Sequence, residues 1–279
     1  MTSPAPAPLH DVEEPTPETA GYGLYSVAVP VDDPDPHAAN GVQWEPTICG
    51  LATTFPVGCA VESPFPGDVP EGTDLVQAPP IGVHAGIQCK PVGTTLEHLR
   101  DVARARMRLT EQTAVERAYW TGEGWAPDVE PVHLADAVAA EILSGTALKP
   151  ALAFGRLEEA IGLMTGAVGV IHAPRVAFQA LKGMVSESRG VMRTELGTKV
   201  VFGTGYPGSG PAGQARTDEA TWLYATGPVK VVRRPVIDLP ENLPEALDRE
   251  TNVATVQTAR IVSVGHSCGL FAVPTNLTV

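Results

Sequence analysis

A glycine-rich stretch directly after an apolar run is the part of this sequence whose residue types could do chemistry. Gly203, Gly205 and Gly208 have the GxGxxG spacing of loops that cradle the phosphates of dinucleotides. Such a site needs a helix that begins at the last glycines, so that its amide groups meet the pyrophosphate. Pro211 and a polar run follow instead, and no helix can begin there. The stretch 203–210 is therefore predicted to be a flexible loop, and an α/β enzyme with a phosphate-binding loop is kept as an alternative.

The histidines show no metal-binding or catalytic spacing, because neither HxH nor HExxH occurs. His266, Ser267 and Cys268 are consecutive, but neighbouring residues of a strand point to opposite faces. A Cys–His pair would also need an orienting group, for which the sequence offers no candidate. His172, at the end of a buried apolar run, is predicted to be a hydrogen-bonded core residue. We therefore expect no enzyme, no catalytic residue, no cofactor and no metal.

Charge and cysteine content limit the class of protein further. The net charge of −13 argues against tight nucleic-acid binding, which requires Lys and Arg to displace phosphate counterions. Four cysteines are too few for a disulfide scaffold; Cys49 and Cys59 bracket an apolar segment and could pair, although a reducing compartment disfavours this. No apolar signal core or run of about 20 apolar residues is present. These features predict a soluble, cytoplasmically made product without a membrane partner.

The clearest element that could position these residues is a helix over 95–121. Thr94 and Glu97 have capping-box spacing, and Gly122 is placed to end the helix. At about 1.5 Å per residue the helix is a rod of about 40 Å. Its apolar side chains form a narrow stripe, which is typical of a helix that lies across another layer.

The remaining elements follow a recognisable order. Residues 1–20 are rich in Pro, Ala and Glu and predict an extended arm without a core of its own. Residues 49–89 alternate short β-prone pieces with Pro-Gly punctuation, which favours a protruding hairpin. The other expected elements are a strand at 22–31, helices at 134–143 and 155–164, a strand at 168–172, a helix opened by Pro174, and strands at 198–202, 222–233, 252–264 and 269–273.

This order resembles the major capsid proteins of tailed bacteriophages, whose Hong Kong 97-type fold is shared with encapsulin shells. The segments that carry the resemblance are LTEQTAVERAYWTG, GVIHAPRVAFQAL, ELGTKVVFGTGYPG and ATGPVKVVRRPV. The resemblance implies an α+β fold with an N-terminal arm, an extended β-hairpin loop, a spine helix and a mixed α/β axial domain. The implied boundaries are 1–30 for the arm, 31–92 for the extended β-rich loop region, 93–129 with 239–279 for the peripheral domain, and 130–238 for the axial domain.

The function that the resemblance implies is self-assembly into the hexamers and pentamers of an icosahedral phage head that encloses double-stranded DNA. Its location would be the virion capsid, after assembly in the bacterial host cytoplasm. Scaffolding, portal and cement proteins are further implied partners, and packaged DNA would be held without sequence-specific contacts. An encapsulin-like nanocompartment shell is the alternative with the same fold.

Nine residues are predicted to lie at subunit interfaces. The arginines among them are expected to pair with carboxylates of neighbouring subunits, because the chain is acidic overall. The aromatic and acidic residues of the loop are expected to touch the neighbouring subunit, and Tyr206 to face the centre of the capsomer. The nine are Phe65, Asp68, Glu71, Arg104, Arg108, Glu111, Tyr206, Arg233 and Arg234.

Overall fold

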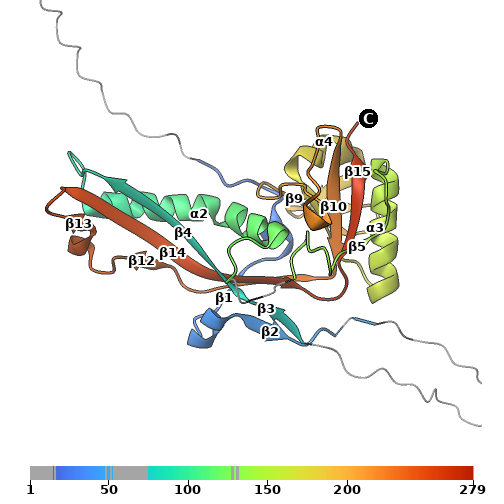
Figure 1. Ribbon diagram of the computed structural model, residues 1–279, viewed down its shortest axis with the longest axis horizontal. Helices are drawn as coiled ribbons and strands as arrows, with labels where there is room; N and C mark the ends of the chain where they lie inside the picture. The colour runs from blue at the N-terminus through green and yellow to red at the C-terminus, as the bar shows by residue number, and fades with distance from the viewer. Residues whose placement is uncertain are drawn as a thin grey trace, which may run out of the picture.

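The molecule is elongated, with a long two-stranded β-ribbon backed by a helix at one end and a compact sheet with its own helices at the other (Figure 1). The computed structural model describes residues 15, 17–47, 49–50, 52, 75–126, 129 and 132–278. Residues 1–14 and 16 of the predicted arm and the predicted loop residues Phe65, Asp68 and Glu71 lie outside the described residues.

The long helix is α2 (Leu96–Thr121), as predicted. Its N-cap is Thr95, one residue later than expected, and the Thr95 hydroxyl accepts a hydrogen bond from the backbone N–H of His98. Gly122 ends the helix in the left-handed region (φ 79°), which a glycine adopts without strain. The stripe that includes Leu99 and Met107 is buried against the sheet beneath it.

A six-stranded sheet forms the elongated part, and all but one of its pairings involve β14 (Val253–His266). β14 pairs antiparallel with β4 (Pro80–Cys89) over ten residues, and α2 lies across both strands. The other antiparallel partners of β14 are β11 (Val229–Arg233), β12 (Ile237–Leu239) and β13 (Leu247–Asp248). β1 (Val31–Asp32) adds to β11 in parallel.

The compact end is a seven-stranded sheet with α3 (Pro150–Thr165) and the one-turn α4 (Phe178–Leu181). Short 3-10 turns, Arg175–Ala177 and Lys182–Met184, flank α4. The strand order is β5 (Glu141–Ile142), β15 (Phe271–Asn276), β10 (Ala220–Thr226), β6 (Val170–Pro174), β9 (Lys199–Gly203), β8 (Val191–Thr194) and β7 (Val185–Ser188). Gly227-Pro228 interrupts the predicted strand 222–233, so that β10 belongs to this sheet and β11 to the other.

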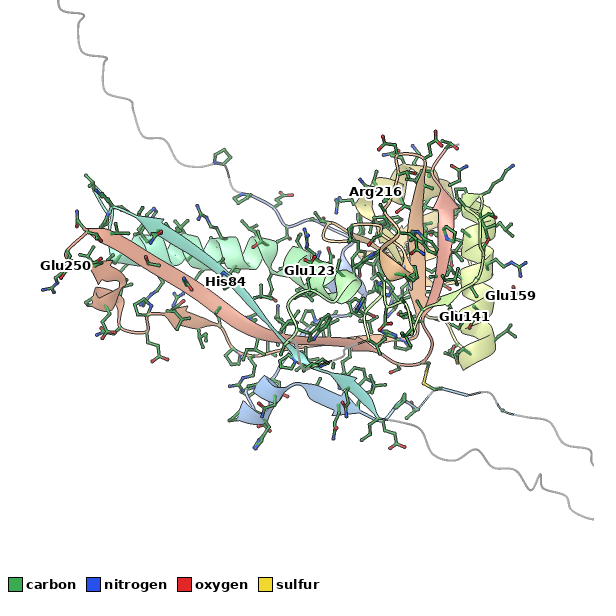
Figure 2. The ribbon with its side chains drawn as sticks, in the orientation of Figure 1. His84, Glu123, Glu141, Glu159, Arg216 and Glu250 are labelled. Atoms are coloured by element: carbon green, nitrogen blue, oxygen red, sulfur yellow. A yellow bond between two sulfur atoms is a disulfide. The ribbon has the colours of Figure 1, made fainter. Side chains whose placement is uncertain are left out.

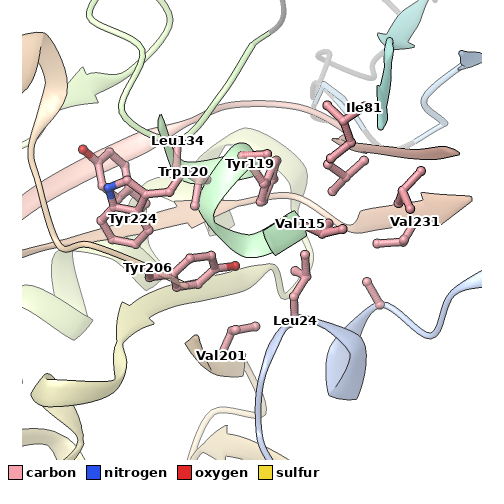
Figure 3. Packing of buried hydrophobic residues seen from close by; sticks show 14 of the residues in the cluster. Leu24, Ile81, Val115, Tyr119, Trp120, Leu134, Val201, Tyr206, Tyr224 and Val231 are labelled. Atoms are coloured by element: carbon pink, nitrogen blue, oxygen red, sulfur yellow. The ribbon is translucent and has the colours of Figure 1, made fainter. Parts of the chain in front are cut away.

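Strand periodicity divides the side chains of the seven-stranded sheet between two cores. Leu223 and Ala225 pack with α3 and α4 on one face, while Tyr224 points to the other face. On that second face the ring of Tyr224 lies 4.8 Å from that of Trp120 at the C-terminal end of α2, and Tyr119 belongs to the same cluster (Figure 3). The last two turns of α2 therefore pack against both sheets.

Two predicted elements are wrong. Residues 22–31 form no strand at their start but the short helix α1 (Leu24–Val27), and 134–143 form no helix. In the second segment the Asp136 carboxylate accepts hydrogen bonds from the backbone N–H groups of Val138 and Ala139. The N–H groups of Leu134 and Ala135 donate to the last carbonyls of α2. Local side-chain bonds and the end of α2 thus take the backbone groups that a helix would need.

The disulfide also differs from the prediction, since Cys49 pairs with Cys268 and not with Cys59 (Figure 2). The two Cα atoms lie 5.2 Å apart although 219 positions separate them in the chain. Cys59 lies outside the described residues, and Cys89 forms no disulfide within them. The bond joins the segment before residue 53 to the turn between β14 and β15.

A second anchor lies close to the disulfide. β2 (Val42–Trp44) pairs antiparallel with β3 (Val76–Ala78), and the indole N–H of Trp44 donates to the Ser267 hydroxyl at 2.8 Å. The residues that flank 53–74 on both sides are therefore held at the same place, near the end of β14.

We expect removal of the disulfide to lower the free energy of unfolding by about 2–5 kcal/mol, because the bond closes a very long loop of the unfolded chain. Urea denaturation of Cys268→Ser and Cys49→Ser should give the same loss. Cys89→Ser is the matched control and should leave stability nearly unchanged. Equal stability of all three variants would contradict the Cys49–Cys268 pairing.

Candidate functional site

A pocket of about 540 Å³ opens between α2, β11, β12 and β14, and it brings together several residues that the sequence singled out. The chain that precedes α1 forms part of its rim through Thr19 and Ala20. The lining is Thr19, Ala20, Tyr25, Arg104, Met107, Arg108, Leu109, Glu111, Gln112, Thr113, Arg233, Val236, Asp238, Thr258 and Arg260.

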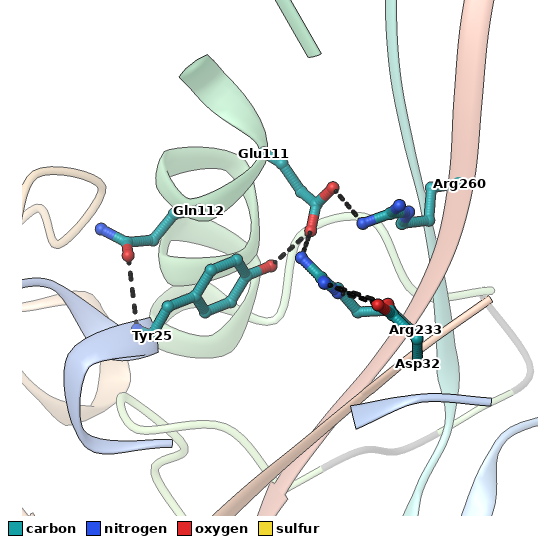
Figure 4. Close-up of polar contacts among 6 residues, drawn as sticks. All are labelled: Tyr25, Asp32, Glu111, Gln112, Arg233 and Arg260. Atoms are coloured by element: carbon teal, nitrogen blue, oxygen red, sulfur yellow. Dashed lines mark hydrogen bonds and ion pairs between the residues drawn. The ribbon is translucent and has the colours of Figure 1, made fainter. Parts of the chain in front are cut away.

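Glu111 is the centre of the polar network in this pocket (Figure 4). It is only 4% exposed. Its Oε1 accepts hydrogen bonds from Arg233 Nη1 at 3.2 Å and from the Tyr25 hydroxyl at 3.0 Å, and its Oε2 accepts from Arg260 Nη1 at 3.0 Å. Burial, and next the Glu111 carboxylate, raise the pKa of Tyr25, so that this phenol remains a donor. A buried carboxylate is compensated here by two guanidinium groups and a hydroxyl.

Two further ion pairs extend the network toward the rim. Arg233 also donates to Asp32 on β1, with Nε–Oδ1 at 3.0 Å. Asp238 on β12 accepts from Arg104 and from the Thr258 hydroxyl, and the bond from Arg104 is the main cause that lowers the pKa of this carboxyl. Helix α2 and strands β1, β11, β12 and β14 are thus linked through charged side chains.

Three of the four arginines predicted at subunit interfaces have partners within the subunit. Arg104 and Arg233 pair with carboxylates of the same chain, and Arg234 donates to the carbonyl of Pro34. The reason is that segments distant in sequence, one helix and two strands, bring Glu111, Asp32 and Asp238 to them. Arg108 is exposed and forms no hydrogen bond or ion pair with any described residue.

The glycine-rich stretch is a packed loop rather than a flexible one. A Cβ on Gly205 would lie 2.0 Å from the carbonyl oxygen of Thr113, so only glycine allows this approach to α2. Tyr206 is 3% exposed and its ring lies 4.8 Å from that of Trp120. The prediction that Tyr206 faces a subunit interface is therefore not supported by its position. Only a three-residue 3-10 turn follows, at Pro211–Gly213.

Glu116 of α2 holds this loop in place. Its side chain is fully buried, and its carboxylate accepts hydrogen bonds from the backbone N–H of Leu24 at 2.8 Å and of Gly205 at 2.9 Å. Burial raises the pKa of Glu116, and the backbone N–H bonds partly oppose this. One carboxylate on α2 thus joins the start of α1 and the loop after β9. Because an acidic group already occupies the Gly205 amide, the loop does not form a phosphate cradle.

Two buried histidines complete the contact between the sheets. His172 on β6 lies 3.0 Å from both the Tyr206 hydroxyl and the Thr226 hydroxyl, as expected of a hydrogen-bonded core residue. His266 on β14 lies 2.8 Å from the Tyr119 hydroxyl. Burial lowers the pKa of His266 to about 4, and burial together with His266 lowers that of His172 well below its usual value. Both rings are therefore neutral at pH 7.

Other kinds of site receive no support from the described residues. Among them no group of three or more His, Cys, Asp and Glu is arranged to hold a metal ion. None of the described helices is long and apolar enough to cross a membrane.

We expect Glu116→Leu to lower the free energy of unfolding by about 2–4 kcal/mol, because two buried backbone N–H groups lose their acceptor. Glu116→Gln retains one carbonyl oxygen and should lose about half as much. Glu97→Leu, at an exposed position of the same helix, should change stability by less than about 1 kcal/mol. Chemical denaturation measures all three, and an equal effect of the Leu variants would contradict the role assigned to Glu116.

The histidines make a prediction about pH. The folded pKa of His266 lies below the unfolded value, so between pH 6.5 and 4 the unfolded chain binds more protons. Stability should therefore fall as the pH falls through this window, by up to about 3 kcal/mol from His266. Urea denaturation at several pH values should show a smaller fall for His266→Gln than for the parent. His37 has a side chain that is 92% exposed, so His37→Gln should lose as much stability with falling pH as the parent does. If its loss is as small as that of His266→Gln, the attribution of the pH dependence to His266 is wrong.

Comparison with known proteins finds similarity in structure alone. No protein-family model matches the sequence, and no curated protein matches it. A solved chain from Mycobacterium phage Ogopogo aligns with a TM-score of 0.55 at 12% identity, covering 96% of this chain and 97% of the other. The capsid of an empty GTA particle aligns with a TM-score of 0.52 at 12% identity, covering 94% of this chain and 99% of the other. For the capsid of Ralstonia phage GP4 the TM-score is 0.51 and the identity 12%, with 98% of this chain and 96% of the other covered.

The likeness extends from one end of the chain to the other, so it includes the elongated part as well as the seven-stranded sheet. The chain therefore has the α+β, Hong Kong 97-type fold of phage and GTA capsids, as its sequence predicted.

Proposed function

We propose that this chain is a major capsid protein, which self-assembles into the hexamers and pentamers of an icosahedral phage head around double-stranded DNA. The observation that carries this proposal is the similarity of fold over nearly the whole length of both chains to the capsids of a GTA particle and of Ralstonia phage GP4. A virion location follows from the same proposal, with assembly in the bacterial host cytoplasm.

The two parts of the fold suggest the domains of the subunit. The peripheral domain is the six-stranded sheet with α2, and the axial domain is the seven-stranded sheet with α3 and α4. The sequence-based boundaries 93–129, 239–279 and 130–238 differ from this division at β11 (Val229–Arg233) and β12 (Ile237–Leu239), which pair with β14 and which we place with the peripheral domain. We place β15 (Phe271–Asn276) with the axial domain, because it pairs with β10 and β5.

The segment 53–74 is the proposed contact with a neighbouring subunit, through Phe65, Asp68 and Glu71. Support for this comes from the residues that flank it: the β2–β3 pair and the Cys49–Cys268 bond hold both flanks at one place. A segment held at both ends can meet a neighbour at a defined position. Scaffolding, portal and cement proteins are further proposed partners, and the net charge of −13 suits DNA contacts that are weak and independent of sequence.

Two other functions are weighed against this one. An encapsulin-like shell has the same fold, but the similar structures named above are of phage and GTA origin. An enzyme that binds phosphate at residues 203–210 is disfavoured, because Gly205 donates to Glu116 and Tyr206 is buried.

The first experiment is size-exclusion chromatography with negative-stain electron microscopy on the purified full chain and on particles from its native source. Icosahedral shells or capsomer rings are expected. Packaged DNA would separate a phage head from a cargo-loaded shell. A discrete small oligomer that forms no rings under any condition would overturn the proposal.

Replacement of residues 63–72 by ten Gly and Ser residues should leave a folded, soluble subunit that does not form closed shells, because the proposed contact is lost at constant chain length. The thermal midpoint reports folding and electron microscopy reports assembly. Arg249→Glu, an exposed charge reversal near the β13–β14 turn, is the control and should assemble normally. Normal shells from the replacement variant would refute the role assigned to this segment.

A further inference from the structure

The pocket around Glu111 is basic in a chain that is acidic. Four of its lining side chains are arginines, and two are carboxylates. The whole chain, in contrast, has 19 basic and 32 acidic residues. An excess of positive charge at this one place requires an explanation, because like charges held together destabilise the fold unless an anion is near.

Part of this positive charge has no partner among the described residues, because Arg108 is exposed and unpaired there. Arg260 pairs with Glu111 through Nη1, but its buried Nε has no hydrogen-bond acceptor. The network within the subunit therefore explains Arg233, Arg104 and the charge of Arg260, but neither Arg108 nor the free Nε donor. A guanidinium group with free donors is suited to a carboxylate.

The pocket also has an apolar side. Met107 is buried, and Val236 remains 39% exposed at the rim. The complementary ligand is therefore a short peptide segment that combines carboxylates with an aliphatic side chain. A free inorganic anion would leave this apolar surface uncovered.

The course of the chain points to one such segment. Thr19 and Ala20 line the pocket, so the described chain leads from it toward residues 1–14. Residues 9–14 read LHDVEE, which combines three carboxylates with Leu9 and Val12, and no Lys or Arg occurs in the first 20 positions. These residues are five to ten positions from Thr19 and can span up to about 35 Å when extended, which is enough to reach any part of the pocket.

We infer that residues 9–14 bind in this pocket of their own subunit, with carboxylates of Asp11, Glu13 and Glu14 on Arg108 and Arg260. Leu9 or Val12 covers the apolar side at Met107 and Val236. The short connection gives the segment a high effective concentration at its own pocket, which favours binding within one subunit over binding between copies. The inference concerns the single subunit and does not depend on capsid assembly.

Hydrogen exchange of residues 1–20, read by mass spectrometry in the full chain, tests the inference. Amides of 9–14 should exchange at least about tenfold more slowly than expected for an unstructured peptide. Arg108→Glu should abolish this protection without unfolding the subunit, because Arg108 is exposed and forms no hydrogen bond or ion pair with any described residue. Arg249→Glu makes the same charge change at an exposed site elsewhere and should retain the protection.

A charge exchange adds specificity to the test. The triple variant Asp11→Lys, Glu13→Lys, Glu14→Lys should lose protection, and its combination with Arg108→Glu should restore part of it. Unprotected amides in the parent, or equal protection in Arg108→Glu and the parent, would overturn the inference. Protection that rises with protein concentration would assign the segment to the pocket of a second copy and would equally overturn binding within one subunit.

Discussion

The contact between the two sheets depends on a carboxylate that is fully removed from water. Glu116 would be costly at its position if its oxygens had no donors, and the two backbone N–H groups of Leu24 and Gly205 supply them. Leu24 begins α1, and Gly205 lies in the loop after β9. The same carboxylate therefore determines where the start of α1 and this loop can lie. The approach of Gly205 to the Thr113 carbonyl follows from this bond, and so does the choice of glycine at that position.

Helix α2 contacts both sheets, and the side chains that make these contacts differ in chemistry along the helix. Its C-terminal turns carry Tyr119 and Trp120 into the shared core, where aromatic rings and two neutral histidines fill the space. Its middle carries Glu111, whose partners lie on β11, β14 and α1. Apolar packing supplies most of the favourable free energy, while the polar groups define the register of helix on sheet, since each of them is costly when it is left without its partner.

The sequence predicted those elements whose signals are local. Helix α2 has its cap, its stripe and its glycine stop within one continuous segment, and β6 and β9 are apolar runs between turn residues. The failures share a cause, which is that a distant segment supplies the partner. The backbone of 134–143 forms hydrogen bonds with the end of α2 and with β15. Cys49 pairs with Cys268, which follows the end of β14. Arg233 pairs with Glu111, which is 122 positions away in the sequence. Periodicity and spacing contain no information on such pairs.

These distant partners also explain why a site predicted at the surface lies partly inside the subunit. An acidic chain with few basic residues is expected to use its arginines between copies, yet a buried carboxylate such as Glu111 has a stronger requirement for them than any exposed one. The subunit therefore satisfies its internal charges first, and Arg108 is left exposed without a partner among the described residues.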